Sequence, residues 1–195
     1  MSPIIVVMPS DRFLRTALAC LLFATLAACG NDAGEPAAGA SGSTPAEAPS
    51  AAPVLPTDPL ALPDFDPESF RAMLDDVSAG TPVVVNFYGS WCGPCKREAP
   101  IFAKMHRRYG DSVQFIGVDV LDTKDGARRF INEYGIEYPS VFDPSASGDI
   151  RSSYGFLGQP ATLFFNYGGE ESYRYEGEMD EESLERAIRP LLPSA

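Results

Sequence analysis

The sequence is poor in histidine and cysteine, and this limits the metal chemistry open to it. His106 is the only histidine among 195 residues, and the four cysteines are Cys20, Cys29, Cys92 and Cys95. A structural zinc site takes four cysteine or histidine ligands. One histidine and one closely spaced cysteine pair do not make such a set, so we expect no metal. The same shortage disfavours copper delivery.

Basic residues are also few. The chain has 15 lysines and arginines against 27 aspartates and glutamates, which gives a net charge of −12. Nucleic acids and anionic membrane surfaces are bound through basic patches, so the composition disfavours both as partners. The hydrophobic content of 45% is ordinary for a chain that builds a core, and the length suits one domain with accessory segments.

One cysteine pair lies between a predicted strand and a predicted helix. Cys92 and Cys95 are separated by Gly93 and Pro94, and they follow the apolar run of residues 82–88. This run is too continuously apolar for a half-exposed strand, which favours a buried parallel strand at the centre of a sheet. Proline suits the first turn of a helix. A Cys-x-x-Cys motif in this setting is typical of a redox site, and a structural disulfide is the alternative interpretation.

The start of a helix favours an anion, because it presents unpaired N–H groups and the positive end of the helix dipole. We therefore expect Cys92 to be the nucleophilic thiolate, with a pKa below the value of about 8.5 for a free thiol. Cys95 lies one turn into the helix and is expected to resolve a mixed disulfide formed on Cys92. His106 lies too far along this helix to activate Cys92, which disfavours Cys–His hydrolase chemistry, and we expect it at the surface.

Residues 85–96, with the sequence VNFYGSWCGPCK, resemble the active-site segment of thioredoxin-like proteins. Within this superfamily they are most similar to the extracytoplasmic TlpA/ResA/CcmG group, and the resemblance covers roughly residues 64–193. It implies a thioredoxin-like α/β fold, in which a central mixed sheet has helices on both faces. Residues 138–142 and 149–154 are similar to the strand and helix inserted in TlpA-like proteins. No cofactor is expected.

The remaining elements follow from sequence patterns. Helices are expected to start near Asp66, Asp125 and Asp180, and strands to cover residues 113–120 and 171–175. The Gly168-Gly169 pair predicts a tight turn before the last strand, which would lie at the sheet edge.

Pro160 immediately precedes an apolar strand at residues 161–165. Only about 5% of X-Pro bonds are cis, so an ordinary trans turn proline is one interpretation. The resemblance implies the other, a cis-proline packed beside the Cys-x-x-Cys motif. The backbone around Gln159 would then lie beside Cys92 and could pair with an extended substrate segment.

Glu98 lies three residues beyond Cys95, on the same helical face. It matches a glutamate of ResA-type proteins that is associated with proton handling. A buried carboxyl with a raised pKa could relay a proton to or from Cys95, and a solvated glutamate is the alternative. Asn86 stands where thioredoxin has a buried aspartate, and an amide cannot titrate, which leaves proton transfer to Glu98 or water. Trp91 is expected to pack beside Cys92, with a purely core role as the alternative.

The N-terminus resembles a bacterial lipoprotein signal peptide. Arg12 and Arg15 precede an apolar stretch of residues 17–28, which is too short to span a bilayer, and a buried core helix is the weaker alternative. The resemblance implies lipid attachment to Cys29, with translation starting at Met1 or Met8. The predicted organisation is a signal peptide over 1–28, a flexible linker rich in Ala, Gly, Pro and Ser over 29–62, and the thioredoxin-like domain over 63–195.

The resemblance implies an extracytoplasmic thiol-disulfide oxidoreductase, anchored to a bacterial membrane. Its partners would be the thiols and disulfides of exported proteins, with apocytochrome c as a candidate client, and a membrane or extracytoplasmic electron donor. The same chemistry run in reverse, disulfide formation in an oxidising compartment, is one alternative. A non-catalytic module that binds extended peptides is the other.

Overall fold

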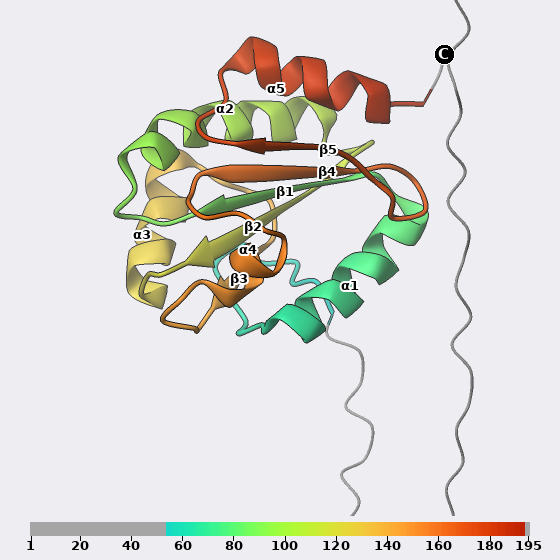
Figure 1. Ribbon diagram of the computed structural model, residues 1–195. Helices are drawn as coiled ribbons and strands as arrows, with labels where there is room; N and C mark the ends of the chain where they lie inside the picture. The colour runs from blue at the N-terminus through green and yellow to red at the C-terminus, as the bar shows by residue number, and fades with distance from the viewer. Residues whose placement is uncertain (1–53, 194–195) are drawn as a thin grey trace, which may run out of the picture. The chain divides into compact units, whose positions relative to one another are not determined.

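A five-stranded mixed sheet lies at the centre of residues 54–193, the part of the chain described in this computed structural model (Figure 1). The strand order is β3-β2-β1-β4-β5. β1 pairs in parallel with β2, and β2 with β3, whereas β4 is antiparallel to β1 and to β5. The strands are β1 (Val83–Tyr88), β2 (Gln114–Val120), β3 (Ser140–Asp143), β4 (Ala161–Phe165) and β5 (Glu171–Glu176).

Helices cover both faces of this sheet (Figure 1). They are α1 (Pro67–Gly80), α2 (Gly93–Tyr109), α3 (Lys124–Tyr134), α4 (Asp149–Ser153) and α5 (Glu181–Ile188), followed by a 3₁₀ turn, η1 (Arg189–Leu191). Residues of α2, α3 and α5 pack on one face, around Val84 and Phe115. Residues of α1 and α4 pack on the other, around Val85 and Ile116. The predicted thioredoxin-like α/β architecture is confirmed, including the inserted strand β3 and helix α4.

Local signals in the sequence explain where the helices start and stop. Asp66 accepts a hydrogen bond from the Ser69 N–H and forms a capping box, and Pro67 occupies the first turn of α1. Asp180 caps α5 by accepting a hydrogen bond from the Ser183 N–H. α3 ends at Gly135, whose φ of 60° is a left-handed conformation that glycine adopts without strain.

The residues just before the predicted domain start at residue 63 pack against its core. Leu62 is fully buried in the core beside α3 and α2, with Leu60 packed against it. Asp64 forms an isolated bridge with Phe142 of β3. Apolar side chains at the end of the predicted linker, which covers residues 29–62, therefore contribute to the core of the predicted domain, which covers residues 63–195. The predicted signal peptide, Cys29 and the linker through residue 53 lie outside the described residues.

Within residues 54–193, no helix has the length and apolar character needed to cross a bilayer.

Candidate active site

The cysteine motif lies where the central strand β1 ends and α2 begins. All six residues of β1 are buried, so the strand fixes the position of the loop that follows. The Cys92 N–H donates to the Gly89 carbonyl at 3.0 Å, and Cys92 is the N-cap of α2. Gly93 and Pro94 form the first turn of the helix. The loop therefore holds Cys92 at the positive end of a 17-residue helix.

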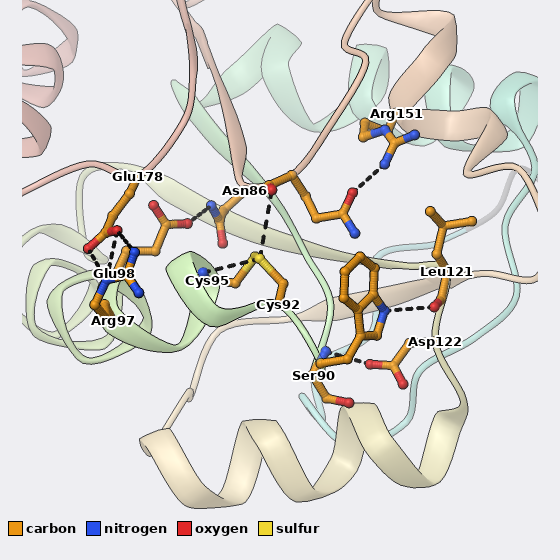
Figure 2. The surroundings of a disulfide bond; sticks show 12 residues. Asn86, Ser90, Cys92, Cys95, Arg97, Glu98, Leu121, Asp122, Arg151 and Glu178 are labelled. Atoms are coloured by element: carbon orange, nitrogen blue, oxygen red, sulfur yellow. Dashed lines mark hydrogen bonds and ion pairs between the residues drawn. A yellow bond between two sulfur atoms is a disulfide. The ribbon is translucent and has the colours of Figure 1, made fainter.

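Cys92 and Cys95 form a disulfide, with 2.09 Å between the two sulfur atoms. The Cys95 N–H donates to Cys92 Sγ at 3.2 Å (Figure 2). This backbone donor and the helix dipole would both favour negative charge on Cys92 Sγ when the disulfide is reduced. Both cysteines are buried, and Cys95 is the deeper of the two.

The loop before β4 lies against the sulfur of Cys92. The Gln159–Pro160 peptide bond is cis, the isomer expected from the resemblance. The main-chain oxygen of Gln159 is 3.7 Å from Cys92 Sγ (Figure 2). The cysteine motif and the proline loop, 67 residues apart in sequence, thus form one site.

Glu98 lies beneath the cysteine pair and is almost completely buried, with 1% of its surface exposed. Its Oε1 accepts a hydrogen bond from Asn86 Nδ2 at 2.8 Å (Figure 2). Its Oε2 accepts one from the Met179 N–H at 3.0 Å. Burial raises the pKa of Glu98 to about 7, although both hydrogen bonds act to lower it. The alternative of a solvated glutamate is therefore wrong. Asn86 also contacts Thr162 Oγ1, at 3.4 Å.

Trp91 lies on the surface beside the site, with 58% of its side chain area exposed. Its indole N–H donates to the Leu121 carbonyl at 2.8 Å, and the neighbouring Ser90 N–H donates to Asp122 Oδ2 at 2.5 Å (Figure 2). The loop after β2 therefore supports the active-site loop. A purely core role for the tryptophan is excluded by its exposure.

His106 differs from its prediction as a surface residue. It is partly buried, and its ring packs edge-on against Phe115 and Tyr138. Burial lowers its pKa. Arg107 and Arg108, which follow it, are exposed, and their polarity hid the fact that the ring of His106 packs against the sheet.

Sequence reasoning missed Arg151, Leu121 and Asp122. Arg151 of α4 donates a hydrogen bond from Nη1 to Gln159 Oε1 (Figure 2). No motif marks any of the three. Leu121 and Asp122 reach the site through contacts about 30 residues away in sequence, and the contact of Arg151 depends on how α4 meets the proline loop. Within residues 54–193, no cluster of three or more His, Cys, Asp or Glu side chains is arranged to hold a metal ion.

A buried cysteine pair at a helix N-terminus, facing a cis-proline loop on this mixed sheet, defines a thioredoxin-like protein with a redox-capable disulfide. Comparison with known families gives the narrower assignment. Residues 59–171 match the AhpC/TSA family, which is more than half of the chain, and the chain belongs to this family.

Named relatives agree with this assignment. The thiol-disulfide oxidoreductase ResA of Bacillus thuringiensis subsp. konkukian is 28% identical over 115 residues, which are 58% of this chain and 65% of that protein. ResA of Bacillus subtilis is 28% identical over 129 residues, 66% of this chain and 70% of that protein. The first of these matches spans just under two thirds of the relative's length.

Solved structures are similar in fold. StoA of Bacillus subtilis has a TM-score of 0.50 and 26% identity, over 56% of this chain and 84% of that chain. The structure of MTB DsbF in mixed oxidised and reduced forms has a TM-score of 0.54 and 26% identity, over 60% of this chain and 84% of that chain.

Proposed function

We propose that this protein is a thiol-disulfide oxidoreductase that reduces disulfides of exported proteins. The observation that carries the proposal is the placement of Cys92 Sγ. It accepts the Cys95 N–H at the start of α2 and lies 3.7 Å from the main-chain oxygen of Gln159. The ResA relatives, which are named thiol-disulfide oxidoreductases, support it.

In the proposed reaction the reduced pair gives two electrons to a client disulfide. The Cys92 thiolate attacks one client sulfur, the client S–S bond breaks, and a mixed disulfide forms between Cys92 and the client. The first client thiolate leaves and takes up a proton. Cys95 then loses its proton and attacks Cys92 Sγ, which releases the second client thiolate and forms the Cys92–Cys95 disulfide.

Glu98 is the proposed relay for the proton that Cys95 loses. It lies one helical turn beyond Cys95, and burial raises its pKa to about 7. A carboxyl with this pKa can both accept and return a proton near neutral pH, which suits general acid–base catalysis. Asn86 cannot titrate, so its proposed role is to orient Glu98 through the hydrogen bond from its amide.

The proposed docking site for clients is the backbone at Gln159 and Pro160, beside Cys92 Sγ. An extended client segment that pairs with this backbone gains affinity without a demand for one sequence. Different clients could then present a disulfide to Cys92.

The proposed location is outside the cytoplasm, at a bacterial membrane. Residues 1–28 would be a signal peptide, Cys29 would carry lipid, and the Ala-, Gly-, Pro- and Ser-rich stretch after it would be a flexible tether. Apocytochrome c is a candidate client on the basis of the family resemblance. A membrane or extracytoplasmic electron donor would regenerate the reduced pair.

The reduction potential of the Cys92/Cys95 pair tests the proposed direction. The purified protein is equilibrated against glutathione or dithiothreitol buffers, and the reduced fraction is measured by thiol alkylation. A potential near that of thioredoxin, about −270 mV, is expected of a reductant. A potential near −120 mV would instead make the protein a disulfide-forming oxidase.

A further inference from the structure

Arg151 is a buried cation in the inserted helix α4, with 6% of its surface exposed. Among the described residues, no carboxylate forms an ion pair with its guanidinium. Its side-chain hydrogen bond goes to the neutral amide of Gln159, and its Nε is buried with no partner in the described region. A buried charge normally needs a charged partner to offset its lost hydration. The local structure therefore holds a positive charge that it does not neutralise.

The fold makes specific room for this guanidinium. Gly148, the N-cap of α4, has a φ of 68°, and a Cβ atom there would lie 3.4 Å from both Cζ and Nη2 of Arg151. Leu121, whose carbonyl binds the Trp91 indole, lies beside the same glycine. Gly148 thus lies against both Arg151 and the loop after β2, and this second loop also supports the active site.

Gln159 connects this cation to the reacting sulfur. Its side-chain oxygen accepts the hydrogen bond from Arg151, and its main-chain oxygen lies 3.7 Å from Cys92 Sγ (Figure 2). The guanidinium is therefore separated from Cys92 Sγ by Gln159 and one contact at each of its two ends. In a buried setting a charge acts over such a distance with little screening.

The other charged groups around the cysteine pair do not provide a positive charge equivalent to that of Arg151. Arg97 is exposed and paired with Glu178, with 2.9 Å between Nε and Oε2, and Lys96 is exposed to solvent. Among the acidic groups, Asp122 accepts a hydrogen bond from the Ser90 N–H, and burial raises the pKa of Glu98 to about 7. Arg151 is the buried cation near the site whose charge no described carboxylate offsets.

We propose that Arg151 stabilises the Cys92 thiolate through space and so sets the redox equilibrium of the pair. The inference rests on the proposed thiol-disulfide function and names a residue that controls it. Reduction of the disulfide creates a negative charge on Cys92 Sγ, whereas the disulfide form carries none. A fixed positive charge therefore favours the reduced form and makes the pair easier for an electron donor to reduce.

Arg151 does not act as a direct ligand for the client. Its Nε and the Nε2 of Gln159 are both buried beneath the surface. The hydrogen bond to Gln159 instead fixes the distance between the guanidinium and the proline loop. Arg151 is accordingly a positioning residue with an electrostatic effect.

The test compares full-length Arg151→Met with the wild type by two measurements. The first is the pH dependence of Cys92 alkylation in the reduced protein, followed by mass spectrometry of the peptide that contains Cys92. The second is the equilibrium of the oxidised protein and two glutathiones with the reduced protein and glutathione disulfide. Loss of the charge should raise the Cys92 pKa and lower this equilibrium constant about three- to tenfold. Arg151→Lys, which keeps the charge, should stay close to the wild type.

Arg97→Gln is the matched control, because it removes a nearby cation that Glu178 already neutralises. The proposal is overturned if Arg151→Met titrates and equilibrates like the wild type, or if Arg97→Gln has an equal effect. If circular dichroism shows that Arg151→Met does not fold, Arg151→Gln is subject to the same expectations. A wild-type pair that does not exchange with glutathione would refute the proposed function instead, while Cys92 alkylation would still test the role of Arg151.

Discussion

The two faces of the sheet bury different kinds of side chain. The face under α1 and α4 is built from apolar strand residues such as Val85, Phe87 and Val118. The face under α2, α3 and α5 has the alternate strand positions, and four of these are buried polar residues: Asn86, Asp119, Ser140 and Thr162. A buried polar group is costly unless it is hydrogen-bonded or has a function.

The register of the strands arranges these polar positions in order. One row of paired positions crosses four strands. Gly117 of β2 pairs with Ser140 of β3 on one side and with Asn86 of β1 on the other, and Asn86 pairs in turn with Thr162 of β4. Gly117 leaves space for its neighbours, because a Cβ atom there would lie 2.5 Å from Ser140 Oγ. Burial, with a contribution from Asp122, raises the pKa of Asp119 to about 9 on this same face. The α2 face therefore carries most of the buried polar strand positions and the titratable groups Glu98 and Asp119. The other face is mainly apolar, apart from Asp143 of β3 and Arg151 of α4.

The largest expected effect is on the α2 face. Cys92→Ser should abolish disulfide exchange, because the nucleophilic sulfur is lost, and the rate of reduction of a glutathione mixed disulfide is the measurement. Cys95→Ser, the control, should instead accumulate a stable mixed disulfide on Cys92. Full retention of function by Cys92→Ser would identify a peptide-binding module.

On the α1 face, Phe70→Ala should cost stability without changing the chemistry. Phe70 is fully buried and packs edge-on against Phe65 and Tyr154. Removing such a ring costs about 3–5 kcal/mol of unfolding free energy, measured by urea denaturation. Ala72→Ser, at an exposed position of the same helix, should change it by less than about 0.5 kcal/mol. If the Cys92/Cys95 reduction potential shifts in the folded Phe70→Ala variant, the packing of the α1 face also affects the chemistry on the α2 face, contrary to this prediction.

Glu98→Gln should remove a pH dependence of both stability and rate. The pKa of Glu98 is about 7 in the folded protein and 4.5 in the reference state, so the folded protein holds this proton longer as pH rises. Stability should therefore fall by about 3 kcal/mol between pH 4.5 and 7, and Glu98→Gln should lack this fall.

The rate of exchange should follow the same group. The inflection near pH 7 should disappear in Glu98→Gln, with a rate loss on the order of 10²-fold. Urea denaturation and stopped-flow exchange across pH measure the two effects, and Glu133→Gln, an exposed glutamate of α3, is the control. An inflection near pH 7 that persists in Glu98→Gln would remove this carboxyl from the proposed mechanism.

The smallest expected effect is the change in stability when alanine replaces either of two glycines, on helices that cover opposite faces of the sheet. Gly135 after α3 has a φ of 60°, whereas Gly80 ends α1 within the helix, and a Cβ atom would have open space at both. Gly135→Ala should cost about 1 kcal/mol because alanine resists the left-handed conformation, whereas Gly80→Ala, at a helical position, should cause no loss or a small gain in stability. Thermal melting measures both. Equal losses would mean that backbone conformation is not the cause.

Sequence patterns predicted the elements well because their signals are local. Caps such as Asp66 and Asp180 and the apolar run of β1 lie within the segments that they define. The surroundings of the sulfurs were harder to predict. Helical spacing places Glu98 below Cys95, but its burial depends on Met179, 81 residues later.

Arg151 and Leu62 were missed for a related reason. The contact of Arg151 with Gln159 depends on how α4 meets the proline loop, and Leu62 is buried although it follows a stretch rich in Ala, Gly, Pro and Ser. The cis-proline loop came from family resemblance alone, since local sequence favours trans.

The hydrogen bond from the Met179 N–H to Glu98 has a consequence for biosynthesis. Chains are made from the N-terminus, so the cysteines at 92 and 95 emerge long before residue 179 does. A nascent chain can present its thiols to oxidants before the buried carboxyl has its second partner. The site is complete only when nearly the whole domain has been synthesised. The two thiols are therefore exposed before the buried carboxyl that the proposed mechanism uses is in place.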